Sequence, residues 1–336
     1  MPEMPTYWLN IHLAYACRHS GACCSSGWPI PIERERAATV ASAIASGLVA
    51  PAASPWLQPA ASAPEDVAGI LALQPDGQCV WHQRPAAAPA GICTSSPPPA
   101  RRACAVHAAR PVSCMHFPYV CLVDARGVRV TLSHYCPTAA SLLFEHEGPV
   151  EVVEGPSPVP GFDVPEGLDA RESLPPLAAP NRLLSWDEFT EWEREHVRGC
   201  EGAGVRGCLG AEVELFDAAR AAVPSPLSWP EAPVDFEAVW HQRVAPSWNL
   251  LATIVNRYLA AKAFASWAAY LGDGTAAVLR AVEQARAVLV VEAVRQCARH
   301  ERVLGAGLLK QAIRQSDLLL VHYADRRGLI SSAGRD

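Results

Sequence analysis

The stretch CRHSGACCSSGW, residues 17–28, determines how the N-terminal part of the chain can fold. It holds Cys17, Cys23 and Cys24 within eight positions, and two of the three are adjacent. Free cysteines that pack as small hydrophobes would explain one or two such residues, but not an adjacent pair beside a third. Thiolates gathered at one point bind Zn²⁺ or an iron–sulfur cluster. We therefore interpret this stretch as the first arm of a metal site.

The composition fits a folded protein in a reducing compartment. The chain has 336 residues, which is long enough for two domains with a sizeable core. Of these residues, 50% are hydrophobic and 18% are charged, as expected of a chain that folds. The net charge of −6, with no long basic run, argues against nucleic acid or an anionic membrane as partner. The sequence has neither a run of about 18 apolar residues nor a basic export signal, so we expect a cytoplasmic protein. Cytoplasmic thiols stay reduced, which favours metal ligation over disulfides.

The cysteines are concentrated in the N-terminal part of the chain. Nine of the twelve lie between Cys17 and Cys136. Cys121 sits inside a predicted strand and is expected in the core, and Cys93 lies in a proline-rich insertion where no role is expected. The others occupy turn-like segments and are the predicted metal ligands: Cys17, Cys23, Cys24, Cys79, Cys104, Cys114 and Cys136. They exceed the four that one zinc ion needs, so the surplus favours a [4Fe–4S] cluster over Zn²⁺, and the four actual ligands stay open.

A β-hairpin is predicted within the cysteine-rich part. The runs YVCLV (119–123) and VRVTL (128–132) are strand-like and are joined by DARG. If Val123 faces Val128, the open end of the hairpin brings Cys114 and Cys136 together.

The predicted fold class is α+β, with three parts. Residues 1–140 are expected to form a small irregular, metal-stapled domain with the hairpin, and 141–182 a proline-rich linker. Residues 183–336 are expected to form an all-α helical bundle domain. Its helices include one opened by the capping box SWDE (185–188), one that stops near Gly272, and two over 275–300 and 305–326.

Three motifs carry a family resemblance. CRHSGACC (17–24), DGQCVW (76–81) and CAVHAARPVSCMHFPY (104–119) occur in the order and with the spacing of the YkgJ-type cysteine-cluster family. The resemblance implies a zinc- or iron-chelating domain. One position departs from the family, because Ser20, next to His19, stands where the family has its second cysteine. Either that ligand is dispensable, or His19 or Ser20 replaces it, or the site binds fewer metal ions.

A weaker resemblance points to one branch of the same superfamily. CCSSGWPI (23–30) and TLSHYCPTAASLL (131–143) are similar to segments of the flagellin lysine-N-methylases. That likeness implies an iron–sulfur cluster, S-adenosylmethionine as methyl donor and a protein lysine as substrate. Three functions therefore compete: a metal-cluster protein, a protein lysine methyltransferase, and a non-catalytic zinc-stapled module whose helical domain binds a protein partner.

Several polar residues lie near the predicted ligands or form motifs of their own. His107, His116 and His134 each lie within three residues of a predicted ligand and are expected around the centre rather than on the metal. Arg110 either screens the charge of a cluster or solvates the turn at Pro111. Outside the motifs, Glu193 with His196, and Asp317 with His322 and Asp325, are interpreted as solvated surface groups.

Overall fold

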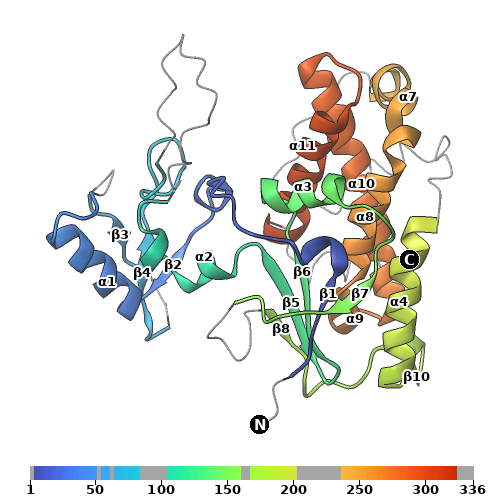
Figure 1. Cartoon of the computed structure of the whole chain (residues 1–336), viewed down its shortest axis with the longest axis horizontal. Helices are drawn as coiled ribbons and strands as arrows, with labels where there is room; N and C mark the ends of the chain where they lie inside the picture. Colours follow the sequence, from blue (N-terminus) through green and yellow to red (C-terminus); the bar gives the residue numbers. More distant parts are fainter. Residues whose placement is uncertain are drawn as a thin grey trace. The chain divides into compact units, whose positions relative to one another are not determined.

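The computed structural model describes residues 4–50, 54–60, 64–83, 104–159, 167–202 and 236–323. The chain divides into two compact units (Figure 1). The sheet–helix unit comprises Met1–Tyr15 and Pro118–Asp336, and the cysteine unit comprises Ala16–Phe117. Several sheets and a C-terminal helical region give mixed α and β content, which confirms the predicted α+β class at that level. Within the described ranges, no helix combines the length and apolar character needed to cross a bilayer.

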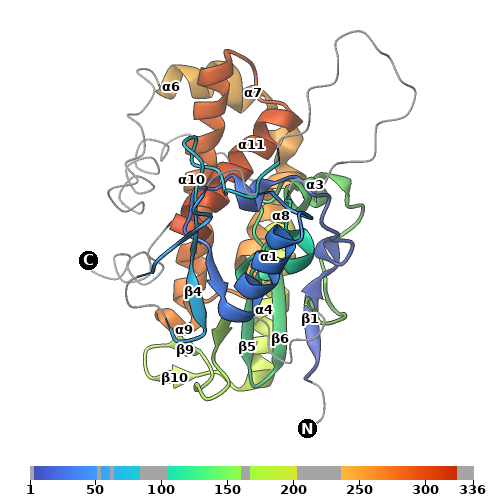
Figure 2. The ribbon, with the colours of Figure 1, turned by 90° about the vertical axis from the view of Figure 1, so that its left-hand side faces the viewer.

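A five-stranded sheet forms the centre of the sheet–helix unit, with strand order β7-β1-β6-β5-β8. The hairpin strands β5 and β6 are antiparallel, β1 pairs parallel with β6, and β8 pairs parallel with β5. Figure 2 shows β5, β6 and β1 together. Every residue of β6 is buried, so this central strand needs cover on both faces. The strands span β1 (Thr6–Leu9), β5 (Tyr119–Asp124), β6 (Gly127–Leu132), β7 (Val152–Glu154) and β8 (Gly167–Asp169).

The predicted register of the hairpin is confirmed. Val123 pairs with Val128, and the ladder continues to Tyr119 opposite Leu132. Gly127 adopts a φ of 123°, and a Cβ at this position would collide with the carbonyl oxygen of Pro5. A glycine is therefore required where the chain entering β1 crosses the turn.

Helices pack against this sheet. The indole Nε1 of Trp267 donates to the carbonyl oxygen of Cys121 at 2.9 Å, and Thr131 Oγ1 donates to that of Ala261 at 3.3 Å. The helices span α3 (Pro137–Glu145), α4 (Trp186–Gly202), α6 (Phe236–Val239), α7 (Ala245–Trp248), α8 (Ala252–Ala263), α9 (Ala268–Leu271), α10 (Thr275–His300) and α11 (Ala306–Asp317). A two-stranded ribbon, β9 (Leu177–Ala179) with β10 (Arg182–Leu183), precedes α4.

Local helix signals are mostly correct. The capping box at α4 forms as predicted: Ser185 N donates to the Glu188 carboxylate at 2.6 Å, and Glu188 N donates to Ser185 Oγ at 3.2 Å. The helix predicted to reach Gly272 is wrong at its end. It breaks after Ala263, where Phe264 is extended and Ala265 takes a φ of 54°.

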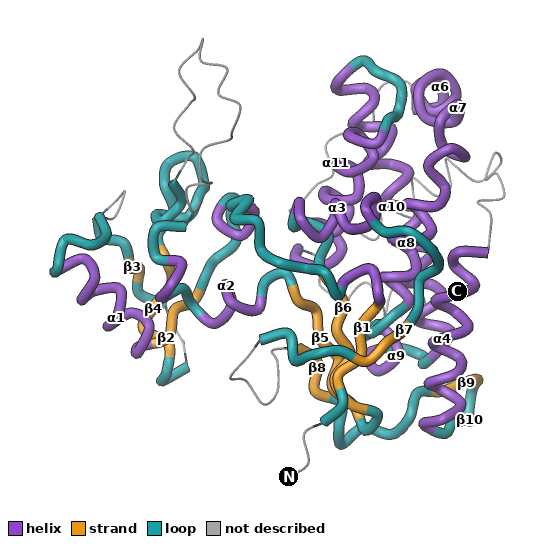
Figure 3. Tube along the Cα trace, in the orientation of Figure 1, coloured by secondary structure: helices purple, strands orange, loops and turns teal. Residues whose placement is uncertain are grey.

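The cysteine unit has little regular structure (Figure 3). Three short antiparallel strands lie in the order β2-β4-β3, and Val40 of α1 and Trp81 are both fully buried in its core. Its elements are β2 (Pro31–Glu33), α1 (Arg34–Ala45), β3 (Leu57–Gln58), β4 (Val67–Leu71) and α2 (Val112–His116).

The predicted domain boundaries differ from those of the structure. Residues 4–15 and the hairpin belong with the helices, because the buried hairpin takes its cover from them. The segment predicted as a linker, 141–182, contributes β7 and β8, the two edge strands of the sheet. Short strands flanked by proline are tolerated at sheet edges, where no further ladder hydrogen bond is needed.

Candidate metal centre

Backbone pairing brings three cysteine segments together in the cysteine unit. Cys24 ends a short helical turn, Ala22–Cys24, and its carbonyl oxygen accepts from Cys79 N at 2.7 Å. Cys104 pairs with His82 in an isolated antiparallel β-bridge, and His82 is only three residues from Cys79 in the sequence. These contacts join residues that are far apart along the chain, so the cysteines are gathered by the fold and not by sequence proximity.

The thiol of Cys24 is the centre of this group. Its sulfur lies 3.9 Å from that of Cys23, and its thiol also interacts with those of Cys79 and Cys104. Cys24 and Cys79 are almost completely buried, with 4% and 3% of their surface exposed. We call Cys23, Cys24, Cys79 and Cys104 the thiol centre.

The four thiols of the thiol centre differ in the direction of their pKa shifts. Hydrogen bonding to its three neighbours, reinforced by burial, raises the pKa of Cys24. The same hydrogen bonds lower the pKa of Cys23, Cys79 and Cys104, against the opposing effect of burial. A lowered thiol pKa favours the thiolate, which is the form that binds a metal ion.

Cys114 and Arg110 flank the thiol centre. Burial raises the pKa of the Cys114 thiol, and the charges of Cys23, Cys104 and Cys79 raise it further. The positive charge of Arg110 lowers the pKa of Cys23 and Cys104, as a minor contribution after the Cys24 hydrogen bond. This position is compatible with charge screening, one of the two roles predicted for Arg110, and the choice between them stays a prediction.

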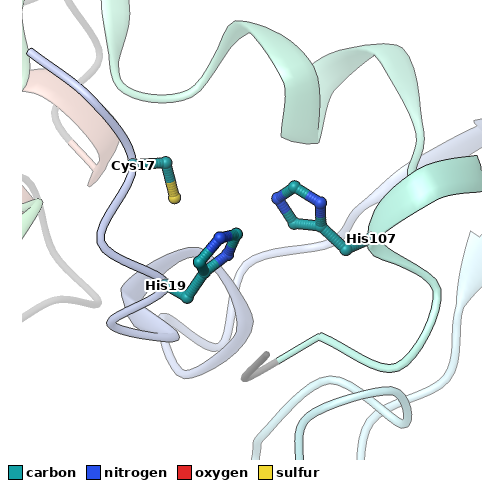
Figure 4. A group of neighbouring side chains, drawn as sticks. All are labelled: Cys17, His19 and His107. Carbon is teal, nitrogen blue, oxygen red and sulfur yellow. The ribbon is translucent and has the colours of Figure 1, made fainter. Parts of the chain in front are cut away.

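A second group of ligand side chains lies in the same unit. The ligand atoms of Cys17, His19 and His107 all lie within 4.8 Å of one another. Figure 4 shows the three side chains converging, two from the loop of residues 17–19 and one from the turn that begins at His107. Cys17 is exposed and both histidines are half-buried. The sequence predicts His107 around the metal rather than on it, and leaves open whether His19 replaces the family's second cysteine.

Cys136 belongs to the sheet–helix unit. It is buried at the start of α3, where its sulfur lies 3.7 Å from the hydroxyl of Tyr15. The hairpin ladder ends at Tyr119–Leu132, and Cys114 lies in α2 of the cysteine unit. The expected proximity of Cys114 and Cys136 therefore stays a prediction.

The remaining predicted residues have varied surroundings. Cys121 is fully buried in β5, as expected of a core residue. His116 is buried in α2, and Ser20 is exposed. Cys93 lies outside the described residues.

His134 belongs to a buried polar network in the sheet–helix unit. Its Nε2 lies 3.2 Å from Nε2 of His12, and its Nδ1 lies 3.3 Å from the carboxylate of Asp317. Asp317 also pairs with Lys262 Nζ at 2.6 Å and accepts from the hydroxyl of Tyr258 at 2.9 Å.

The assignment of Asp317 and Glu193 to the solvated surface is wrong. Asp317 is fully buried, and Glu193, 2% exposed, pairs with two arginines. Both positions had a periodic signal: Phe189 and Val197 flank Glu193 at four-residue spacing, and Ile313 lies four residues before Asp317. Helix periodicity should have outweighed residue polarity at these two positions. Asp325 lies outside the described residues.

No protein-family model, no curated protein and no solved structure matches this chain.

Proposed function

We propose that the chain is a metal-binding protein of the YkgJ-type cysteine-cluster class, with a [4Fe–4S] cluster bound by Cys23, Cys24, Cys79 and Cys104. One observation carries the proposal: the Cys24 thiol interacts with three other thiols, two of them from distant segments. Four thiolates are the usual ligand set of such a cluster.

The chemistry of the cysteine unit fits this group. Cys24 and Cys79 are buried, Cys23 and Cys104 are half-buried, and hydrogen bonding to Cys24 lowers the pKa of the other three thiols, which favours their thiolate forms. A unit with few regular elements gains stability when a metal joins its segments. A bound cluster would supply a structural crosslink and a one-electron redox centre.

Zinc is the rival occupant of the same thiols, since four thiolates also satisfy tetrahedral Zn²⁺. That alternative corresponds to a stapled interaction module. Lysine methyl transfer with S-adenosylmethionine stays a prediction from the weaker resemblance.

The test is anaerobic purification of the full chain, followed by its visible spectrum and by quantification of iron, zinc and acid-labile sulfide. About four irons and four sulfides per chain, with absorption near about 400 nm, are expected. A colourless protein with zinc bound to these thiols would show that the site is a zinc site and not a cluster site. A chain that binds neither metal would overturn the proposal.

A further inference from the structure

We propose that Cys17, His19 and His107 form a second metal site, which binds one Zn²⁺ ion separately from the thiol centre. One thiolate and two imidazoles are a ligand set that zinc accepts. None of the three residues belongs to the thiol centre, so this inference goes beyond the proposed function and does not depend on it.

The geometry requires little movement to close around an ion. Zinc–sulfur and zinc–nitrogen bonds of about 2.3 and 2.0 Å place tetrahedral ligand atoms about 3.3 to 3.6 Å apart. The three ligand atoms already lie within 4.8 Å of one another. The two imidazole rings meet edge to face, with centroids 4.6 Å apart and planes at 72°. Small rotations of partly exposed side chains would complete the contact.

The backbone around His19 is unusual in a way that suits a ligand. His19 takes a φ of 54°, and Gly21 a φ of 73°, so the loop turns sharply at both positions. Left-handed backbone is uncommon for a residue with a side chain and is often found where a binding site holds it. This turn brings His19 back toward Cys17 in Figure 4.

Arg110 forms a hydrogen bond with one of the ring nitrogens of His107. Its Nη1 lies 2.6 Å from Nε2 of His107. A guanidinium only donates, so Nε2 accepts through its lone pair and Nδ1 carries the ring proton. An ion bound at Nε2 takes that lone pair directly. An ion bound at Nδ1 moves the proton to Nε2, which can then no longer accept. Whichever nitrogen binds, the ion must displace Arg110.

Three protein ligands leave a fourth tetrahedral position open. Structural zinc sites usually fill all four positions with protein atoms, whereas open sites bind water or a small exogenous ligand. Because Cys17 is exposed, this position is expected to be reached from solvent.

The full chain is purified anaerobically, and any metal that the thiol centre retains is left in place. Zn²⁺ is then titrated into this protein, and calorimetry measures its binding. The variants are His19→Asn, which tolerates the left-handed backbone, His107→Asn, Arg110→Gln and Cys24→Ser. His82→Asn, in the same unit but outside the trio, is the control. X-ray absorption at the zinc edge reports the ligands of the added ion.

We expect about one added Zn²⁺ in the wild type and in His82→Asn, with a mixed nitrogen and sulfur shell. His19→Asn and His107→Asn should each weaken its binding at least about tenfold, and Arg110→Gln should tighten it. Cys24→Ser should lose the metal of the thiol centre and still bind the added ion. Unchanged zinc binding in both histidine variants would overturn the second site while leaving the thiol centre intact. Normal iron and sulfide content in Cys24→Ser would count against the thiol centre alone.

Discussion

Glu193 of α4 and Arg129 of β6 form a buried ion pair of 2.9 Å that joins the helical layer to the sheet. Arg126, at the hairpin turn, lies 3.2 Å from the same carboxylate. The other Glu193 oxygen accepts from the backbone N of Ala265 at 3.2 Å, at the break after α8. One carboxylate thus contacts a strand, a turn and a helix end.

Replacement of Glu193 by glutamine should destabilise the sheet–helix unit by about 3 kcal/mol, because it leaves buried guanidinium charge without its partner. Urea denaturation measures the free energy of unfolding. Glu191→Gln on the same helix is the matched control, since its pair with Arg198 is exposed and should contribute nothing measurable. Equal effects of the two substitutions would contradict the tethering role of Glu193.

Cys24→Ser should lose the bound metal and lower the free energy of unfolding of the cysteine unit by several kcal/mol, because it removes the thiol shared by three others. Cys121→Ser, at an equally buried thiol in β5, should keep the metal. Metal analysis of both variants after anaerobic purification makes the comparison. Equal metal content would refute the assignment of Cys24.

Stability should fall as the pH drops below about 6.5, the ordinary pKa of histidine. Burial lowers the pKa of His12 well below that value, and burial also lowers the pKa of His134. The unfolded chain therefore binds protons that the folded chain does not. The contribution of each histidine to the free energy of unfolding is fully present above its unfolded pKa. Below that pH the contribution declines by up to about 1.4 kcal/mol per pH unit for each histidine.

The His12→Gln variant isolates this contribution. It should be less stable at pH 7.5 but show a shallower decline between pH 6.5 and 5 in urea denaturation. His300→Gln, at an exposed histidine, should retain the slope of the wild type. A His12→Gln slope equal to that of the wild type would show that His12 does not titrate in this way.

Gly127→Ala should destabilise the hairpin by about 3 kcal/mol, because the new Cβ meets the Pro5 carbonyl oxygen in addition to an unfavourable φ of 123°. Gly148→Ala separates the two effects, since its φ is 89° and nothing lies within 4 Å of its Cβ position. We expect about 1 kcal/mol for that change. Thermal unfolding of both variants tests the difference, and a Gly127→Ala protein no less stable than Gly148→Ala would exclude the collision.

Local features of this protein follow from its sequence by itself. The pairing of Val123 with Val128, the capping box at Ser185 and the extent of α10 were predictable, because each depends on residues close together in the chain. The four residues of the thiol centre are among the seven candidates that cysteine spacing predicts.

Long-range relationships were decided by the tertiary structure. Short-range periodicity cannot tell which layer covers a buried hairpin. The hairpin was expected in the cysteine domain, but it belongs to the same unit as the C-terminal helices. The meeting of His19 with His107 depends on a left-handed turn and on a segment distant in sequence. Asp317 and Glu193 are charged yet buried, because partners from other elements compensate the cost of removing them from water. Those partners come together only when the chain folds.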